Sequence, residues 1–112
     1  MLAQTPPPPY YAVIFTTTRT QGDNGYSAMA TKMEELAKQQ LGYLGIESAR
    51  EETVPTGRQA GITVSYWKDL ESIRNWKMNL DHLQAQKLGK EKWYAQYKLR
   101  ICLVERDYGF EV

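Results

Sequence analysis

Residues 10–18 place the strongest constraint on the fold, because a β-strand built from them is apolar on both faces. Successive side chains of a strand point to opposite sides of the sheet. The two faces are formed by Tyr11, Val13 and Phe15, and by Ala12 and Ile14. A strand that is apolar on both faces is covered on both faces, so we expect it to be a central strand.

Apolar residues recur at helical spacing in two longer stretches. The first covers residues 26–41 and stops at Gly42. Its predicted buried stripe is Tyr26, Met29, Ala30, Met33, Leu36, Ala37, Gln40 and Leu41. The second covers residues 69–78 and begins at Asp69, which can cap it. Its predicted inner edge is Leu70, Ile73, Trp76 and Leu80. A shorter helix is expected over residues 81–88.

Three further strands are expected, over residues 43–50, 61–67 and 94–106. The last alternates between two sets of side chains: Tyr97, Leu99, Ile101 and Leu103, and Lys98, Arg100, Cys102 and Val104. The order βαββαβ is that of the ferredoxin-like α+β fold, in which two helices cover one face of a four-stranded antiparallel sheet.

Two helices on one face leave the other face bare, and this conflicts with the two apolar faces of strand 10–18. A second copy packed sheet against sheet would resolve the conflict, and two-fold dimers are the commonest soluble assemblies. We therefore expect a homodimer whose two sheets form a dimeric α+β barrel.

Composition excludes several other classes of protein. Fourteen basic and thirteen acidic residues leave a net charge of +1, which is not the footprint of a nucleic-acid or membrane-surface binder. No apolar run reaches the about 18 residues of a membrane helix, and the single Cys102 cannot close an intrachain disulfide. The 112 residues predict one domain over 10–112, after a proline-rich extension over 1–9 that does not resemble a signal peptide. We expect a cytoplasmic protein.

Aromatic side chains gather at the corner between strand 61–67 and the helix that follows it, and a pocket is expected there. Tyr66 and Trp67 must point to opposite sides of the sheet, so only one of them can line a cavity beneath the helices. We favour Trp67 for this role. Trp76, on the apolar edge of the helix, suits either core packing or a ligand wall.

The chain resembles the antibiotic biosynthesis monooxygenase superfamily, especially its small single-domain members, over nearly its whole length beyond the prolines. The resemblance lies in the runs YYAVIF (10–15), VSYW (64–67), LESI (70–73) and VERDYG (104–109), and in Trp76, His82, Ala85, Gln86 and Gly89. It implies a dimeric α+β barrel with a pocket between the sheet and the helices of each subunit. Characterised relatives include cofactor-independent monooxygenases of quinone formation, quinol monooxygenases and haem-degrading monooxygenases.

Haem degradation is disfavoured by the residues present. The haem-degrading branch uses an Asn on the first strand, a Trp on the second helix and a His ten positions later. Trp76 matches the Trp, but Gln86 stands where the His would be, and the first strand has Thr16 to Thr18 and no Asn. An amide is a poor axial ligand for iron. His82 would have to take over that role.

The resemblance therefore favours a monooxygenase that needs no cofactor or metal and acts on an aromatic, polyphenol or quinol-type small molecule. We assign catalytic roles to His82, Trp67 and Trp76, with His82 as the proton carrier. We assign substrate binding to Tyr66, Arg74, Asn75 and Gln86.

Structural roles compete with each of these assignments. His82, expected in the first turn of its helix where the dipole favours a neutral ring, could form a hydrogen bond at the helix start. Arg74 could be a solvated charge. The competing function is a non-catalytic dimeric protein of the same fold that binds a small ligand or serves a stress or regulatory role.

Overall fold

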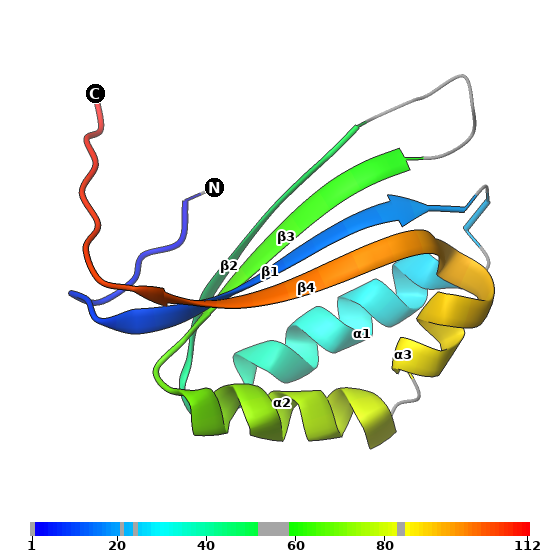
Figure 1. The fold of residues 1–112 in the computed structure, drawn as a ribbon, viewed down its shortest axis with the longest axis horizontal. Coiled ribbons are helices and arrows are strands. Elements are labelled where there is room, and N and C mark those ends of the chain that lie inside the picture. Colours follow the sequence, from blue (N-terminus) through cyan, green and yellow to red (C-terminus); the bar gives the residue numbers. More distant parts are fainter. Residues whose placement is uncertain (1, 21, 24, 52–58, 83–84) are drawn as a thin grey trace.

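The computed structural model describes residues 2–20, 22–23, 25–51, 59–82 and 85–112, and the side chains of residues 81, 82, 85 and 86 lie outside that description. The elements in chain order are β1 (Tyr10–Arg19), α1 (Tyr26–Lys38), β2 (Tyr43–Arg50), β3 (Gln59–Trp67), α2 (Leu70–His82), α3 (Ala85–Leu88), a π-helical turn (Gly89–Trp93) and β4 (Tyr94–Val104) (Figure 1). This order confirms the ferredoxin-like βαββαβ prediction, with a short helix and a turn added before the last strand.

The four strands form one antiparallel sheet in the order β2-β3-β1-β4. β1 is a central strand, as its two apolar faces predicted. Val13 of β1 lies opposite Ser65 of β3 and Ile101 of β4. Cross-strand partners point to the same side of the sheet, so this register decides which side chains share a face.

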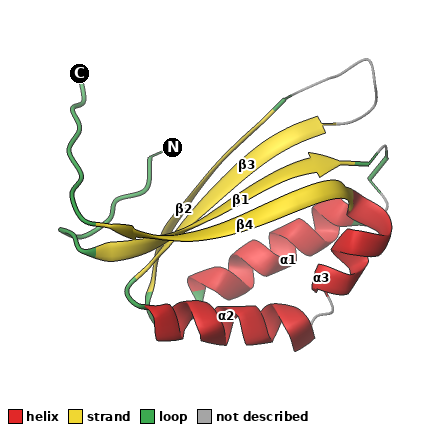
Figure 2. Cartoon of the chain, viewed as in Figure 1, coloured by secondary structure: helices red, strands yellow, loops and turns green. Residues whose placement is uncertain are grey.

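The helices lie on one side of the sheet, which we call the helix face, and leave the other side, the outer face, without a helix (Figure 2). The core on the helix face consists of Val13, Ala37, Trp67 and Ile73, with Tyr11, Tyr43 and Trp76 packed against it. α1 and α2 therefore each bury an apolar residue, Ala37 and Ile73, in one core with the central strands β1 and β3.

Asp69 caps α2, as expected. Its Oδ1 accepts hydrogen bonds from the backbone N–H of Ser72 (2.8 Å) and from Ser72 Oγ (2.6 Å). These two bonds lower the pKa of the Asp69 carboxyl below its ordinary value. The bonded carboxylate satisfies an amide of the first helical turn that would otherwise lack a partner.

Several element boundaries differ from the sequence prediction. α1 ends at Lys38, so Leu41 lies beyond the helix and is 91% exposed, although the spacing placed it in the buried stripe. α2 continues to His82, four residues past the predicted end, and its Leu70 is 43% exposed where an inner position was expected. Leu70 is the first residue of α2, where the helix has not yet turned its apolar edge toward the sheet.

The outer face is not bare at the end where β1 begins. Tyr10 and Ala12 point to this face and are only 4% and 5% exposed. The N-terminal segment lies over them, with the Ala3 N–H donating to Glu47 Oε2 (2.9 Å) and Thr5 Oγ1 donating to the Tyr10 hydroxyl (3.1 Å). The chain thus supplies part of the cover that the sequence analysis assigned wholly to a second copy.

Candidate functional site

The helix face of the sheet is open along β4. Leu99, Ile101 and Leu103 are 44%, 55% and 49% exposed, although they lie opposite the inward-pointing side chains of β1. We call these three residues the open β4 face. The helices cover β1 and β3 and leave this apolar strip accessible, so a flat apolar molecule could lie against it.

Tyr11 of β1 lies opposite Leu103, at one end of the open β4 face, and two stacked indoles lie on the far side of Tyr11. Trp67 and Leu103 both have Tyr11 as their cross-strand partner. Trp67 is fully buried, its Nε1–H donates to Ser65 Oγ (2.9 Å), and its ring stacks on Trp76 at 6.1 Å with an interplanar angle of 25°. Since the Trp67 N–H is already paired, this residue can support a wall but has no free donor to offer a ligand.

Phenol rings lie beside the other end. Phe15, the cross-strand partner of Leu99, has its ring centroid 5.4 Å from those of Tyr94 and Tyr97. Burial, and then the neighbouring Tyr26, raise the pKa of Tyr94. Tyr94 therefore stays uncharged at neutral pH and can take part in hydrogen bonds but not act as a base.

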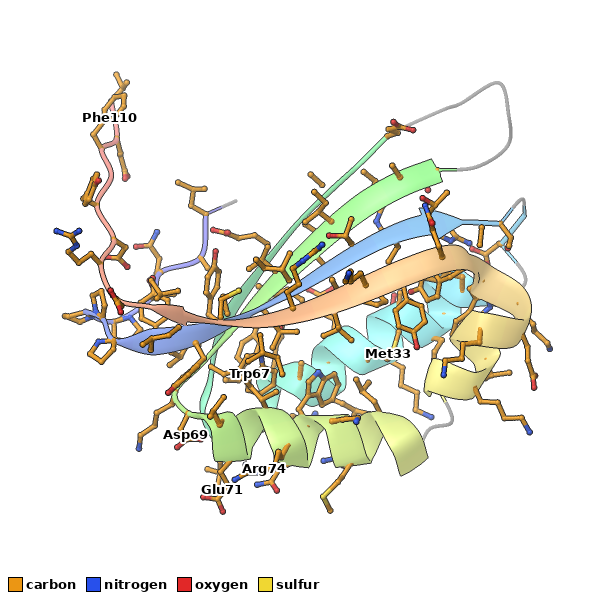
Figure 3. The ribbon with its side chains drawn as sticks, in the orientation of Figure 1. Met33, Trp67, Asp69, Glu71, Arg74 and Phe110 are labelled. Atoms are coloured by element: carbon orange, nitrogen blue, oxygen red, sulfur yellow. The ribbon has the colours of Figure 1, made fainter. Side chains whose placement is uncertain are left out.

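The structure brings together two of the predicted site residues, Trp67 and Trp76, and separates others from them. Arg74 and Asn75 are exposed on α2, and Figure 3 shows Arg74 pointing away from the sheet, whereas Trp67 lies between the sheet and the helices. Tyr66 points to the outer face, as expected of the neighbour of Trp67, so these two aromatics cannot line one cavity.

His82 is the last residue of α2, not a residue of the first turn of the next helix. The expected place in the first turn of a helix is therefore wrong, because α2 continues to this residue. Gln86 lies in α3. The side chains of both residues fall outside the described part of the structure.

The sequence analysis missed a polar cluster on the outer face. The Tyr66 hydroxyl donates to Glu47 Oε1 (2.7 Å), and the Tyr10 hydroxyl donates to Asp107 Oδ2 in a short hydrogen bond. Burial and the bond to Glu47 raise the pKa of Tyr66, and burial and the bond to Asp107 raise that of Tyr10. The sequence feature that could have indicated this cluster is Glu47, a charged residue within the predicted strand 43–50.

A groove of about 530 Å³ lies beside this cluster, between the two terminal segments of the chain. Its lining includes Glu47, Tyr66, Asp107, Phe110 and Glu111. Figure 3 shows Phe110 near the end of the C-terminal segment, which extends on the side of the sheet away from the helices. The molecule therefore offers two distinct surfaces, an apolar one on the helix face and an acidic one on the outer face.

Over the described residues, no three His, Cys, Asp or Glu side chains gather as a metal site. The described helices include none long and apolar enough to span a membrane.

The chain is similar in sequence to a bacterial protein and in fold to several solved structures. No family model matches the sequence. The chain is 43% identical over 110 residues to the uncharacterized protein YqjZ of Bacillus subtilis, covering 98% of this chain and 92% of YqjZ.

The solved structures that resemble it share the fold at low sequence identity. SnoaB, a cofactor-independent oxygenase from Streptomyces nogalater solved as a mutant, has a TM-score of 0.70 at 9% identity, over 88% of this chain and 95% of SnoaB. A dimeric ferredoxin-like protein of unknown function from Thermobifida fusca has a TM-score of 0.66 at 9% identity, over 93% and 100% of the two chains. A Bacillus cereus protein assigned to the antibiotic biosynthesis monooxygenases has a TM-score of 0.63 at 14% identity, over 92% and 100%. The chain therefore belongs to the same protein family as YqjZ and has the ferredoxin-like fold of the antibiotic biosynthesis monooxygenases.

Proposed function

We propose that this protein is a cofactor-independent monooxygenase that oxidises an aromatic, polyphenol or quinol-type small molecule. The observation that carries the proposal is the open β4 face, an apolar strip on the side of the sheet that the helices otherwise cover. Tyr11 and Phe15 of β1 lie opposite its two ends, Leu103 and Leu99. The fold shared with SnoaB, a cofactor-independent oxygenase, supports the same reading by analogy.

The chemistry requires little from the protein. A deprotonated, electron-rich phenol can pass electrons to O2 directly, and one phenol and one O2 give one quinone and one water. The substrate supplies all four electrons, one oxygen atom enters the ring and the other leaves as water. The site must hold the flat ring, stabilise the anion and carry a proton.

In this proposal Trp76 forms a wall of the site, Trp67 holds Trp76 in place, and His82 carries the proton because the unperturbed pKa of imidazole lies near neutrality. The substrate-binding roles of Tyr66, Arg74, Asn75 and Gln86 stay predictions. Tyr66 could reach a ligand only from the outer face, and Arg74 and Asn75 only from the exposed side of α2.

We also propose that the protein is a homodimer packed through the outer faces of its sheets and that it works in the cytoplasm. The two-sided apolar pattern of β1 and the dimeric Thermobifida fusca protein of similar fold support the dimer. The free thiol of Cys102 is compatible with a reducing compartment.

Oxygen uptake with a panel of polyphenols and quinols tests the activity. We expect wild type to exceed the buffer rate. His82→Ala should lower the rate by roughly 100-fold or more, the contribution typical of general acid–base catalysis. Ile101→Glu should also lower it, because a carboxylate on the apolar strip opposes the binding of a flat apolar molecule. Leu70→Glu is the matched control: Leu70 is an apolar residue of similar exposure on α2, and the rate should stay within about twofold of wild type.

The competing function is non-catalytic binding of a small apolar ligand, which the open β4 face would serve equally well. Quenching of tryptophan fluorescence by the same compounds separates the two functions. Quenching that Ile101→Glu abolishes, together with background oxygen uptake in wild type, would establish binding without catalysis. A haem-dependent role ranks lower and would require a Soret shift on haem titration that His82→Ala removes.

A further inference from the structure

A row of four residues crosses the outer face from one edge of the sheet to the other. Glu47 of β2 lies opposite Val64 of β3, Val64 lies opposite Ile14 of β1, and Ile14 lies opposite Arg100 of β4. β2 and β4 are the two edge strands. The row thus has an acid at one edge, a base at the other, and two apolar side chains between them.

Among the described residues, neither end of the row has a partner of opposite charge. Arg100 is exposed and has neither a hydrogen bond nor an ion pair in the described part of the structure. Glu47 is half-buried, and among the described residues it accepts only from the Tyr66 hydroxyl and the Ala3 N–H. A carboxylate has about four acceptor positions, so Glu47 can receive further donors.

The surroundings of Glu47 favour a cation. Glu47 lines the groove of about 530 Å³ on the outer face, together with Asp107 and Glu111. The lining of the groove falls wholly within the described residues and contains no Lys, Arg or His. A guanidinium entering the groove would therefore meet carboxylates and aromatic rings, both of which bind it.

A two-fold axis can join two outer faces in two simple ways. If the axis runs along the strands, the row of one copy faces the same row of the other copy in reverse order. β2 of one copy then lies opposite β4 of the other. An axis across the strands brings like edges together, with Glu47 near Glu47 and Arg100 near Arg100. The first arrangement places Glu47 near Arg100 at two symmetry-related contacts, and these opposite charges attract. The second places like charges together at both edges, and these repel.

We propose that the occupant of the outer face is a second copy of this chain, related by a two-fold axis along the strands, and that Arg100 of each copy pairs with Glu47 of the other. The proposal rests on the homodimer proposed above and adds the edge pairing and the residues that select it. An acid and a base on opposite edges of one row are self-complementary, as a two-fold interface requires.

The test uses full-length chains and measures the dimer dissociation constant by light scattering across a dilution series. Arg100→Glu should raise Kd by roughly 10- to 100-fold, because it places like charges at both symmetry-related contacts. Lys98→Glu is the matched control. It makes the same charge change on the same face of β4, but the row of Lys98 ends at Ala49, so Kd should stay within about threefold of wild type.

Mixing two separately purified variants gives the decisive measurement. Glu47→Arg and Arg100→Glu chains should each dimerise poorly alone, yet they should form heterodimers with nearly wild-type Kd, since every cross-copy contact then joins opposite charges. The helical circular dichroism of each variant should match wild type, which separates lost pairing from lost folding.

Three results would overturn the inference: Arg100→Glu weakening the dimer no more than Lys98→Glu, mixed variants failing to associate, or a wild-type chain that stays monomeric at micromolar concentration. The last would also remove the proposed homodimer but would leave the oxygen-uptake test standing. If oxygen uptake stayed at background while the variants dimerised as expected, the proposed activity would be wrong and the proposed interface would stand.

Discussion

The Trp67 and Trp76 rings are stacked 6.1 Å apart, and the two residues differ sharply in burial: Trp67 has no exposed surface, whereas Trp76 is half-buried. Trp67 also belongs to the central cluster that joins the sheet to both helices. The buried ring therefore serves the fold, and the partly exposed ring is the one available to a ligand.

This difference predicts unequal costs of truncation. Trp67→Ala should lower the free energy of unfolding by about 3–5 kcal/mol, because it leaves a large cavity in the core. Trp76→Ala should cost less, about 1–2 kcal/mol, since part of its surface is already in water. Urea unfolding followed by circular dichroism measures both. Equal costs would show that Trp76 is as much a core residue as Trp67.

The sequence predicted the strands and the central position of β1 because two-sided apolar patterning has one simple structural cause. It did not predict the open β4 face. The alternation of Leu99, Ile101 and Leu103 was evident, but which strands the helices cover depends on tertiary packing. It also missed Glu47, whose partners Ala3 and Tyr66 lie far from it in the chain. His82 was assigned to the wrong helix end, because no residue near it marks where α2 stops.

Gly42 and Gly25 provide a matched pair for a second prediction. Both have φ of +86°, a left-handed conformation that a side chain disfavours. A Cβ at Gly25 would meet open space, whereas a Cβ at Gly42 would overlap Ser72 Oγ and approach Ser72 Cβ at 2.7 Å. Ser72 Oγ cannot move away without losing its hydrogen bond to the Asp69 cap.

We therefore expect Gly42→Ala to lower the free energy of unfolding by about 2–4 kcal/mol, the sum of backbone strain and overpacking. Gly25→Ala should cost only about 1 kcal/mol, for strain alone. Thermal and urea unfolding of the two variants check the difference. If Gly25→Ala proves as costly as Gly42→Ala, contact with Ser72 is not what restricts position 42.

The Tyr66–Glu47 hydrogen bond predicts how stability depends on alkaline pH. The folded protein raises the pKa of Tyr66, first through burial and then through the bond to Glu47. In the unfolded chain a tyrosine ionises near pH 10. Above that pH the unfolded state loses the proton while the folded state keeps it, so the stabilisation is complete below about pH 10 and declines as pH rises further.

Tyr66→Phe removes both the hydrogen bond and this titration. At neutral pH it should cost about 1 kcal/mol, since the bond to a carboxylate is partly exposed to solvent. Above about pH 10 the stability of this variant should fall less steeply than that of wild type. The variant lacks the phenol that ionises in the unfolded state while it stays protonated in the folded state. Tyr97→Phe is the comparison variant, since Tyr97 points to the helix face and has no carboxylate partner in the described structure. Urea midpoints measured from pH 7 to 11 test the slope, and parallel curves for wild type and Tyr66→Phe would mean that folding does not raise the pKa of Tyr66.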